Sequence, residues 1–528
     1  MIKSEKAKKI ICFLIPNLLY LALILYFYCN TYTPYGDSFE IFYREVLLFS
    51  LGYFIVFSFV YLILRKLFKL DYYNVFFIEL SLILMTFYIA YSEPIIWILV
   101  ILFNIFIFKR SEDTKVKFCF FISFVVLILF QLNFIESTGY ILKNMSRFED
   151  KDIVYTTKVD NNLKTPNIYW IHCDGMINLE DVNKYFEFDS NEFKKYLDDN
   201  KFIVNSDASF YSTGHTLQSL AALYNPKYYD MVLKEYFDNV NNDNFDDKII
   251  TFDKLTDKRL NNELFTSLKE KDYKLVSITE FNHYSAFYTD YIFDYYNFQH
   301  SKEQDLDYMT SEDFSYDEFM KFIYYSHFKT LGDVTFTHYF TDNYNFLKHK
   351  EIDYNKFDFS KYPSIDKGDY WKAKAMIASL DMMYKKDIDN SLFTFIDFEL
   401  NHTPWVLDEN GKKVNTNKEG FLLDNYVSNY EYSTKVLGEL IDYIKSNDSN
   451  AIIILQADHG IHTVGARKVM SYFDGSSDDV NALRNSTFSA IYIPEEYING
   501  DEKYLDNPLN ISRYLVNNFV GENYTYVE

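Results

Sequence analysis

Cysteine is scarce in this sequence, and its distribution excludes a disulfide-stapled C-terminal part. The chain has 4 cysteines in 528 residues, and Cys173 is the only one after residue 136. Repeats and low-complexity tracts are lacking as well. A single thiol has no partner within its own part of the chain, so no disulfide forms there even in an oxidising compartment.

Positive charge is also in short supply. Lysine and arginine total 52 against 75 aspartates and glutamates, a formal net charge of -23 at pH 7. The first 136 residues hold 12 of the basic and 10 of the acidic side chains, so the remainder carries a net charge of -25. Such an acidic segment argues against nucleic acid, or another polyanion, as a partner bound by bulk charge. An anionic substrate must be held locally, by a metal ion or a few basic side chains.

Long hydrophobic runs are concentrated in the first 136 residues. Five runs approach the roughly 20 residues that a bilayer-spanning helix needs, and they cover residues 10–28, 46–64, 75–91, 95–108 and 118–135. Residues 1–136 are therefore predicted to form a transmembrane bundle of about five helices. The first run lacks a small-residue cleavage site, which indicates an anchor rather than a removed signal peptide.

Basic residues predict the orientation of these spans. They cluster before the first run, after the second, and between the fourth and the fifth, whereas the alternate loops hold only Arg44. Because basic residues favour the cytoplasmic side, the N-terminus is expected there and everything after about residue 137 outside. The sequence predicts a multi-pass protein of the cell membrane with an extracytoplasmic C-terminal domain.

From Pro166 onward, strand and helix patterns alternate. Residues 137–165 are polar and aperiodic, which is typical of a linker. Strand patterns cover residues 167–173, 202–205, 274–279, 395–400, 451–456 and 487–493, and helical patterns cover 192–200, 216–224, 371–385 and an amphipathic closing segment, 511–519. Residues 166–528 are thus predicted to form an α/β domain with a central, mainly parallel sheet between layers of helices. The polar and aromatic insert 227–390 is expected to shape an acceptor pocket.

Two of the predicted strands stop abruptly at metal-binding residue types. The strand NIYWIHC ends at Asp174 and Gly175, and the strand AIIILQA ends at Asp458, His459 and Gly460. The carboxyl ends of parallel strands face the ligand site of an open α/β sheet, so these side chains are expected to converge. The alternative interpretation is a polar loop in which Asp458 caps the next helix.

A third stretch, STGHTLQSLAAL, places Thr216 at or near a helix N-terminus. Threonine caps helices well, which is one interpretation. The other is a nucleophile, because helix amides and the positive end of the dipole would cradle a phosphoryl group and stabilise an alkoxide. A free hydroxyl is a poor nucleophile near neutral pH and would need a metal ion to lower its pKa. Asp174, Asp458, His459 and Thr216 would make an oxygen and nitrogen site suited to one divalent ion, Zn or Mn.

These three stretches, in this order, resemble the alkaline phosphatase and sulfatase superfamily. The closer likeness is to its membrane-anchored phosphotransferase branch, which includes lipoteichoic acid synthases and phosphoethanolamine transferases, and it covers residue 166 to the C-terminus. NIYWIHCDG resembles the first metal-ligand strand, GHTLQSLAAL the nucleophile helix and ADHG the late ligand pair. The resemblance implies that Asp174, Thr216, Asp458 and His459 bind one metal ion and that Thr216 forms a covalent intermediate.

The stretch FIDFELNHTPW carries a further likeness. In the family, a histidine followed by a proline and an aromatic residue binds substrate phosphate or assists the leaving group, which implies such a role for His402, with Trp405 beside it. A solvated loop histidine is the alternative. His215 and His462 are weaker candidates for substrate binding, because they merely adjoin the motifs.

The sequence also departs from the family patterns. Sulfatases convert a cysteine or serine into an aldehyde hydrate, and Thr216 cannot form that aldehyde. Lipoteichoic acid synthases have glutamate at the position of Asp174, and sulfatases usually carry paired acids where Gly175 follows here. The second zinc-binding histidine of phosphoethanolamine transferases is not evident after Gly460, although His462 is near. These motifs leave the donor head group open.

The resemblance implies a transferase that moves a phospho-alcohol group from a membrane lipid to a cell-surface glycan or lipid. Glycerophosphate and phosphoethanolamine are the two types of group expected, with a phospho-threonine ester as the intermediate. One alternative is a sulfatase-like hydrolase of phosphodiesters or sulfate esters. Another is a non-catalytic membrane protein whose outer domain binds surface polymer.

Overall fold

The chain divides into two compact units in a computed structural model. The first unit comprises residues 1–151, 246–253 and 317–347, and the second comprises residues 152–245, 254–316 and 348–528. The structure describes residues 10–22, 39–86, 94–145, 155, 157–210, 216–239, 258, 262–279, 289–294, 309–310, 371–386, 388–403, 405–412, 414, 423–471, 473 and 475–528. Most of the predicted insert 227–390 therefore lies outside the described residues.

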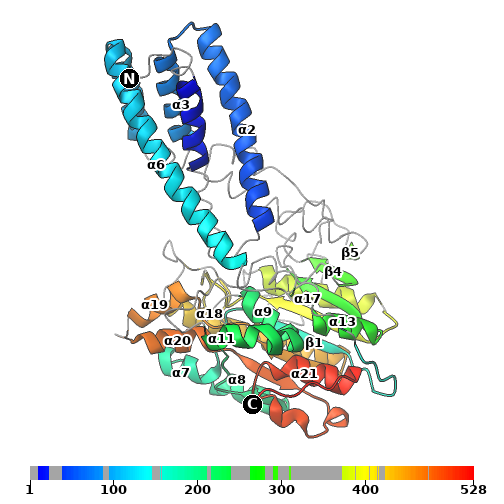
Figure 1. Ribbon diagram of the computed structural model, residues 1–528. Coiled ribbons are helices and arrows are strands. Elements are labelled where there is room, and N and C mark those ends of the chain that lie inside the picture. The colour runs from blue at the N-terminus through cyan, green and yellow to red at the C-terminus, as the bar shows by residue number, and fades with distance from the viewer. Residues whose placement is uncertain are drawn as a thin grey trace. The chain divides into compact units, whose positions relative to one another are not determined.

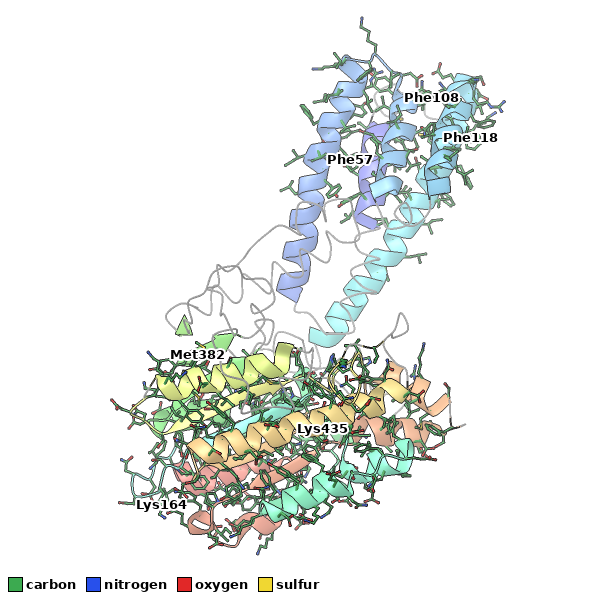
Figure 2. All side chains as sticks on the ribbon, turned by 180° about the vertical axis from the view of Figure 1, so that it is seen from behind. Phe57, Phe108, Phe118, Lys164, Met382 and Lys435 are labelled. Carbon is green, nitrogen blue, oxygen red and sulfur yellow. The ribbon has the colours of Figure 1, made fainter. Side chains whose placement is uncertain are left out.

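Helices make up the described part of the first unit (Figure 1). They are a helix over Ile10–Ala22, α2 (Phe39–Lys66), α3 (Tyr72–Thr86), α5 (Pro94–Phe108) and α6 (Glu112–Met145). Phe57, Phe76 and Phe77 belong to a buried core, while large apolar side chains such as Phe59 and Phe121 are 65% and 66% exposed. Figure 2 labels Phe57, Phe108 and Phe118 among these side chains. A surface of this kind is costly in water and suits a lipid environment.

One helix of the described residues, Glu112–Leu132, is long and apolar enough to cross a membrane. The segments Ile10–Ala22, Tyr72–Ile83 and Ile98–Phe108 are apolar helices of shorter length. The prediction of about five spans therefore stays a prediction.

Helix α6 differs from expectation at its C-terminal end. It continues to Met145, so residues 137–145, the first part of the predicted linker, are helical. Polarity suggested a linker, but helix formers such as leucine, lysine and methionine in this stretch support continuation of the helix.

The second unit is built on an eight-stranded sheet of order β2-β8-β7-β1-β6-β3-β4-β5. The strands are β1 (Ile168–Cys173), β2 (Phe202–Asn205), β3 (Lys274–Thr279), β4 (Tyr291–Asp294), β5 (Met309–Thr310), β6 (Leu392–Phe398), β7 (Ile452–Gln456) and β8 (Ser489–Tyr492). Strands β7, β1, β6, β3 and β4 are mutually parallel, whereas β2, β8 and β5 pair antiparallel at the edges. The predicted α/β fold is confirmed, with a mixed sheet whose centre is parallel.

Helices cover both faces of this sheet. Tyr169, Ile171 and Cys173 point to one face, where they share a buried core with side chains of α7 (Leu179–Phe186), α8 (Asn191–Asp199), α17 (Trp371–Lys385) and α18 (Leu423–Asn447). On the opposite face Trp170 packs edge-on against Tyr224 of α9 (Thr216–Tyr224), with ring centroids 5.4 Å apart. Figure 1 shows α9 and α13 (Glu263–Glu270) in front of the sheet, and Figure 2 shows from behind the helices that carry Met382 and Lys435.

The remaining elements are short. They are α10 (Pro226–Tyr228), a π-helical turn over Tyr229–Leu233, α11 (Lys234–Asn239), α19 (Thr463–Ser471), α20 (Ser477–Asn485), 3₁₀ turns over Glu495–Tyr497 and Asp501–Tyr504, α21 (Asn510–Leu515) and a π-helical turn over Val516–Val520. The predicted closing helix 511–519 is divided between α21, whose residues are all buried, and the π-helical turn, where Asn517 and Asn518 are half-buried. The Arg513 side chain of α21, 1% exposed, is neutralised by Asp230 at 2.7 Å.

Candidate metal centre

The candidate site forms where three neighbouring parallel strands end. Strand β1 pairs with β7 on one side and with β6 on the other. Asp174 follows β1 directly, and Asp458 lies two residues beyond β7. The apolar runs that form these strands are fully buried, so the first polar residues after them are held at the edge of a rigid sheet.

Asp174, Thr216, Asp458 and His459 converge in the structure. The Nε2 atom of His459 lies 3.2 Å from Thr216 Oγ1, 3.4 Å from Asp458 Oδ2 and 3.6 Å from Asp174 Oδ1. Ligands of a tetrahedral ion with bonds of about 2.1 Å stand roughly 3.4 Å apart. The three distances from His459 Nε2 are therefore those expected between ligands of one divalent ion.

Buried oxygens without hydrogen-bond donors support the same conclusion. Asp174 and Asp458 are 3% and 0% exposed, and within the part of the chain that the structure describes, Asp174 Oδ1 and Asp458 Oδ2 have no hydrogen-bond partner. A buried carboxylate oxygen without a donor or a cation is costly. The donor set, two carboxylates, an imidazole and a hydroxyl, suits a divalent metal such as Zn or Mn.

Local hydrogen bonds fix the orientation of these side chains. Nδ1 of His459 lies 2.7 Å from the carbonyl oxygen of Gly460 and donates its proton there, so Nε2 keeps its lone pair for a ligand bond. Asp458 Oδ1 accepts from the backbone N–H of His459 at 2.9 Å and of Gly175 at 3.5 Å. Both glycines are required locally. Gly175 has a φ of +69°, and a side chain at Gly460 would overlap the carbonyl oxygens of Leu483 and Ser486.

The two carboxyl groups differ in acidity. Burial and the neighbouring Asp458 carboxylate raise the pKa of Asp174. Burial also opposes ionisation of Asp458, but His459 and His172 outweigh it and hold the pKa of Asp458 well below its usual range.

Thr216 is the first residue of α9, as predicted. Its side chain is half-buried, and the first turn of α9 presents backbone N–H groups at the same end of the helix. The hydroxyl thus lies where a phosphoryl group would meet the helix amides and the metal ligands together.

Two site residues escaped the sequence analysis. His172 is a fifth nitrogen or oxygen side chain at the centre: one of its ring nitrogens and a carboxylate oxygen each of Asp174 and Asp458 lie within 4.8 Å of one another. Asp397 on β6 is its register partner, with Asp397 Oδ1 3.0 Å from His172 Nδ1. Burial opposes protonation of His172, but the Asp458 and Asp397 carboxylates outweigh it and raise its pKa to about 10. The signal available in the sequence was spacing, since His172 lies two residues before Asp174 and therefore on the same face.

The predicted substrate residues lie in one narrow pocket beside the metal ligands. His402, Trp405, His459 and His462 line it together with Gly175, Asn401, Thr403, Gly460 and Ile461. His402 is exposed and His462 half-buried, and burial followed by the charges of His459 and His402 lowers the pKa of His462. Trp405 is only 1% exposed and donates its indole N–H to the carbonyl of Asn401 at 3.1 Å. Trp405 therefore forms a wall of the pocket rather than a free stacking surface. His215 lies outside the described residues.

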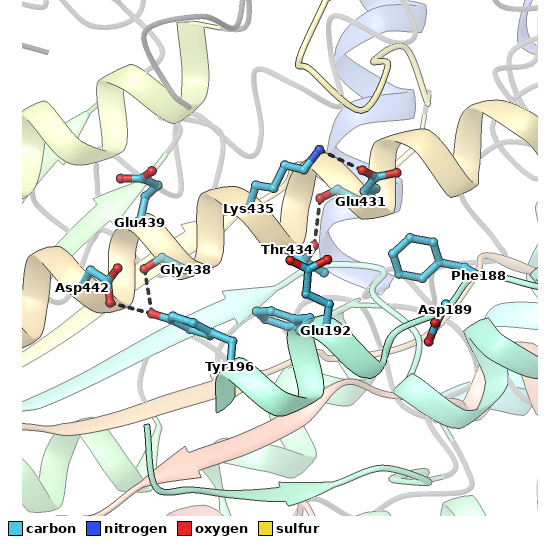
Figure 3. Close-up of a pocket in the computed structure, with 11 residues that line it drawn as sticks. Phe188, Asp189, Glu192, Tyr196, Glu431, Thr434, Lys435, Gly438, Glu439 and Asp442 are labelled. Atoms are coloured by element: carbon cyan, nitrogen blue, oxygen red, sulfur yellow. Dashed lines mark hydrogen bonds and ion pairs between the residues drawn. The ribbon is translucent and has the colours of Figure 1, made fainter. Parts of the chain in front are cut away.

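A larger cavity, of about 570 Å³, lies between α8 and α18 (Figure 3). It is lined by Phe188, Asp189, Glu192, Phe193, Tyr196, Glu431, Thr434, Lys435, Gly438, Glu439 and Asp442. None of the predicted site residues is among them.

No protein-family model and no curated protein matches the chain. Among solved structures, the chain is similar to the C-terminal periplasmic domain of EcEptC from Escherichia coli, at 11% identity and a TM-score of 0.36 over 70% of this chain and 86% of that one. It is similar to the lipoteichoic acid synthase LtaP from Listeria monocytogenes, at 13% identity and a TM-score of 0.31 over 64% of this chain and 69% of that one. A third similar structure is the soluble domain of lipooligosaccharide phosphoethanolamine transferase A from Neisseria meningitidis, at 9% identity and a TM-score of 0.33 over 66% of this chain and 84% of that one.

Proposed function

We propose that this protein is a metal-dependent phosphotransferase whose nucleophile is Thr216. The observation that carries the proposal is the approach of the Thr216 hydroxyl to within 3.2 Å of His459, which itself lies 3.4 and 3.6 Å from the Asp458 and Asp174 carboxylates. A divalent ion held there would lower the pKa of the hydroxyl and neutralise phosphoryl oxygens. A threonine that served only as a helix cap would not need two buried carboxylates and an imidazole beside it.

The first half-reaction is attack of Thr216 Oγ1 on the phosphorus of a membrane-lipid phosphodiester. The hydroxyl proton leaves to solvent, the new P–Oγ1 bond forms, and the bond from phosphorus to the diacylglycerol oxygen breaks. His402, the exposed imidazole of the pocket, donates a proton to the departing oxygen. Diacylglycerol is released and a phospho-threonine ester stays on the enzyme.

The second half-reaction transfers the group to an acceptor hydroxyl of a cell-surface glycan or lipid. His402, now neutral, takes the proton of the attacking hydroxyl as the new P–O bond forms and the P–Oγ1 bond breaks. Thr216 regains its proton from solvent. The amides at the start of α9 and the histidine His462 would hold the remaining phosphoryl oxygens, because the domain as a whole is acidic and offers no bulk attraction.

A lipid donor fits the composition of the first unit. A donor that stays in the bilayer is best reached by an enzyme fixed there, and the apolar helices before residue 146 would provide the anchor. Multi-pass integration and an extracytoplasmic active site are part of this proposal. Glycerophosphate and phosphoethanolamine are the two groups proposed for transfer.

The test is incubation of the full-length protein in lipid vesicles with phosphatidylglycerol or phosphatidylethanolamine labelled in the head group, with Zn or Mn added. Peptide mass spectrometry is expected to find the label on Thr216 and none in Thr216→Ala. Label on another residue refutes the assignment of the nucleophile.

Adding a surface glycan to the same vesicles separates transfer from hydrolysis. Transfer requires label on the glycan, whereas a hydrolase releases the same amount of free head-group phosphate with or without it. If Thr216→Ala supports the normal cellular phenotype while deletion of residues 166–528 does not, the domain is a binding module and not an enzyme.

A further inference from the structure

A buried polar chain crosses three strands beneath the candidate metal centre. His172 of β1 faces Asp397 of β6 in register, with Nδ1 and Oδ1 3.0 Å apart. Thr279, the last residue of β3, donates its hydroxyl to the other oxygen of Asp397 at 3.2 Å. All three side chains are 0% exposed. Each oxygen of Asp397 therefore has a hydrogen-bond partner, and the imidazole is held from its Nδ1 side.

The opposite edge of the imidazole faces the metal ligand Asp458. Nε2 of His172 lies 3.4 Å from Asp458 Oδ1. The ring plane is further fixed by Phe395, which stacks on it at a centroid distance of 5.7 Å and an angle of 27°. His172 is thus clamped between two carboxylates and an aromatic ring.

The two oxygens of Asp458 have different surroundings. Oδ1 accepts from the backbone N–H groups of His459 and Gly175, at 2.9 and 3.5 Å, and His172 Nε2, which has no hydrogen-bond partner among the described residues, lies 3.4 Å from it. Oδ2 faces His459 Nε2 at 3.4 Å and, within the described residues, has no hydrogen-bond donor. Oδ1 is thus held by two backbone donors with the His172 ring beside it, and Oδ2 is left for a cation.

Burying this chain has an energetic cost that packing alone does not explain. An apolar pair of similar volume in the middle of a sheet is often as stable as a buried charge pair, or more stable. At metal sites, ligating carboxylates are held in turn by outer side chains, which fix their orientation toward the ion.

We propose that His172, held by Asp397, is a positioning residue that orients Asp458 so that its Oδ2 atom is presented to the divalent ion. The inference rests on the proposed metal centre but not on the identity of the substrate. Its consequence is that metal affinity depends on a residue pair that lies in the sheet, below the ligands themselves.

The experiment is a calorimetric titration of the metal-free full-length protein in detergent, with Zn²⁺ and, separately, with Mn²⁺. His172→Leu is expected to raise the metal Kd by about 10–100-fold, the usual effect of losing a group that orients a metal ligand. Asp397→Asn, which keeps the size of the side chain, is expected to raise it by about 10-fold. His172→Gln, whose amide can still donate to Asp458, is expected to recover part of the loss.

Ile171→Val is the matched control, because Ile171 is equally buried on the same strand but points to the other face. Its Kd should equal that of the wild type although its unfolding free energy falls. If His172→Leu does not fold, Asp397→Asn and His172→Gln decide the question by the same measurement. Wild-type Kd in the folded His172 and Asp397 variants overturns the proposal.

Co²⁺ substitution separates positioning from direct ligation. The visible absorption bands of Co²⁺ in His172→Gln should keep their wavelengths, since the ligand atoms are unchanged. If the wavelengths of the Co²⁺ bands change in this variant, His172 is itself a metal ligand and the proposal is overturned. If the His172 variants bind metal more weakly than the wild type, as expected, but the wild type transfers no lipid phosphate, the proposed function is refuted and this inference stands.

Discussion

The hydroxyl of Thr216 lies 3.2 Å from Nε2 of His459, although 243 positions separate the two residues in the chain. Thr216 lies at the start of helix α9 on one face of the sheet, and His459 lies in the loop after β7. The contact links a group that can attack phosphorus to the residues that can hold a cation.

Replacing the threonine separates a nucleophile from a helix cap. We expect Thr216→Ala to lower kcat for lipid turnover by at least about 10³-fold, because loss of a catalytic nucleophile typically costs more than that. Thr216→Ser keeps a hydroxyl and should retain measurable turnover. A cap role alone predicts that serine and threonine are equivalent and that alanine costs only about 1 kcal/mol of stability. Steady-state kinetics and urea unfolding of the three proteins distinguish the two roles.

Removing a carboxylate should abolish metal binding. Asp458→Asn is expected to raise the Kd for Zn or Mn by more than about 100-fold, because loss of an outer hydrogen-bond partner alone costs about 10–100-fold. Asp442→Asn, on the surface of the distant cavity in Figure 3, is the control and should bind metal as the wild type does. Equal Kd values for the two variants would contradict the assignment of Asp458.

Metal should also stabilise the fold. At a free concentration of about 100 times its Kd, the ion should raise the unfolding free energy by about 2.7 kcal/mol, since it binds the native state only. Urea unfolding with and without a chelator measures the difference. The Asp458→Asn protein should show no such response, and an equal response there would mean that the ion binds elsewhere.

His402 is expected to act on the leaving group. His402→Gln should lower kcat by about 10²–10⁴-fold, the usual contribution of a general acid, with a smaller change in KM. A donor lipid analogue with a more acidic leaving alcohol needs less protonation and should be turned over by the variant at nearly the wild-type rate. If KM rises while kcat is unchanged, His402 binds phosphate instead.

The sequence was most informative where apolar runs end in polar residues. Six of the strands could be predicted because each is a short apolar or β-branched run: β1, β2, β3, β6, β7 and β8. The two acids at the ends of β1 and β7 were legible for the same reason. The carboxyl ends of parallel strands lie at the same edge of a sheet, so these acids can be expected to lie near one another even before the strand order is known.

What the sequence could not supply was strand order. His172 and Asp397 are 225 positions apart and meet only because β6 pairs with β1 in one register. A shift by one residue would turn one of them to the other face. The same limit applies to the antiparallel edges, because β2 and β8 read like the parallel strands until their partners are known.

Glycine at position 460 should be a strict requirement for stability. A side-chain carbon there would meet the carbonyl oxygen of Ser486 at 2.6 Å and overlap that of Leu483, both of them backbone atoms that cannot turn away. We therefore expect Gly460→Ala to lower the unfolding free energy by about 1–3 kcal/mol through overpacking, and to weaken metal binding because His459 Nδ1 donates to the carbonyl of Gly460. Gly438→Ala is the matched control: the added carbon meets only Tyr196 ring atoms at 3.7 Å or more, and alanine inside helix α18 should raise stability by about 0.5–1 kcal/mol. Urea unfolding of both variants measures the difference, and a Gly460→Ala protein as stable as the wild type would show that the loop after β7 can relax.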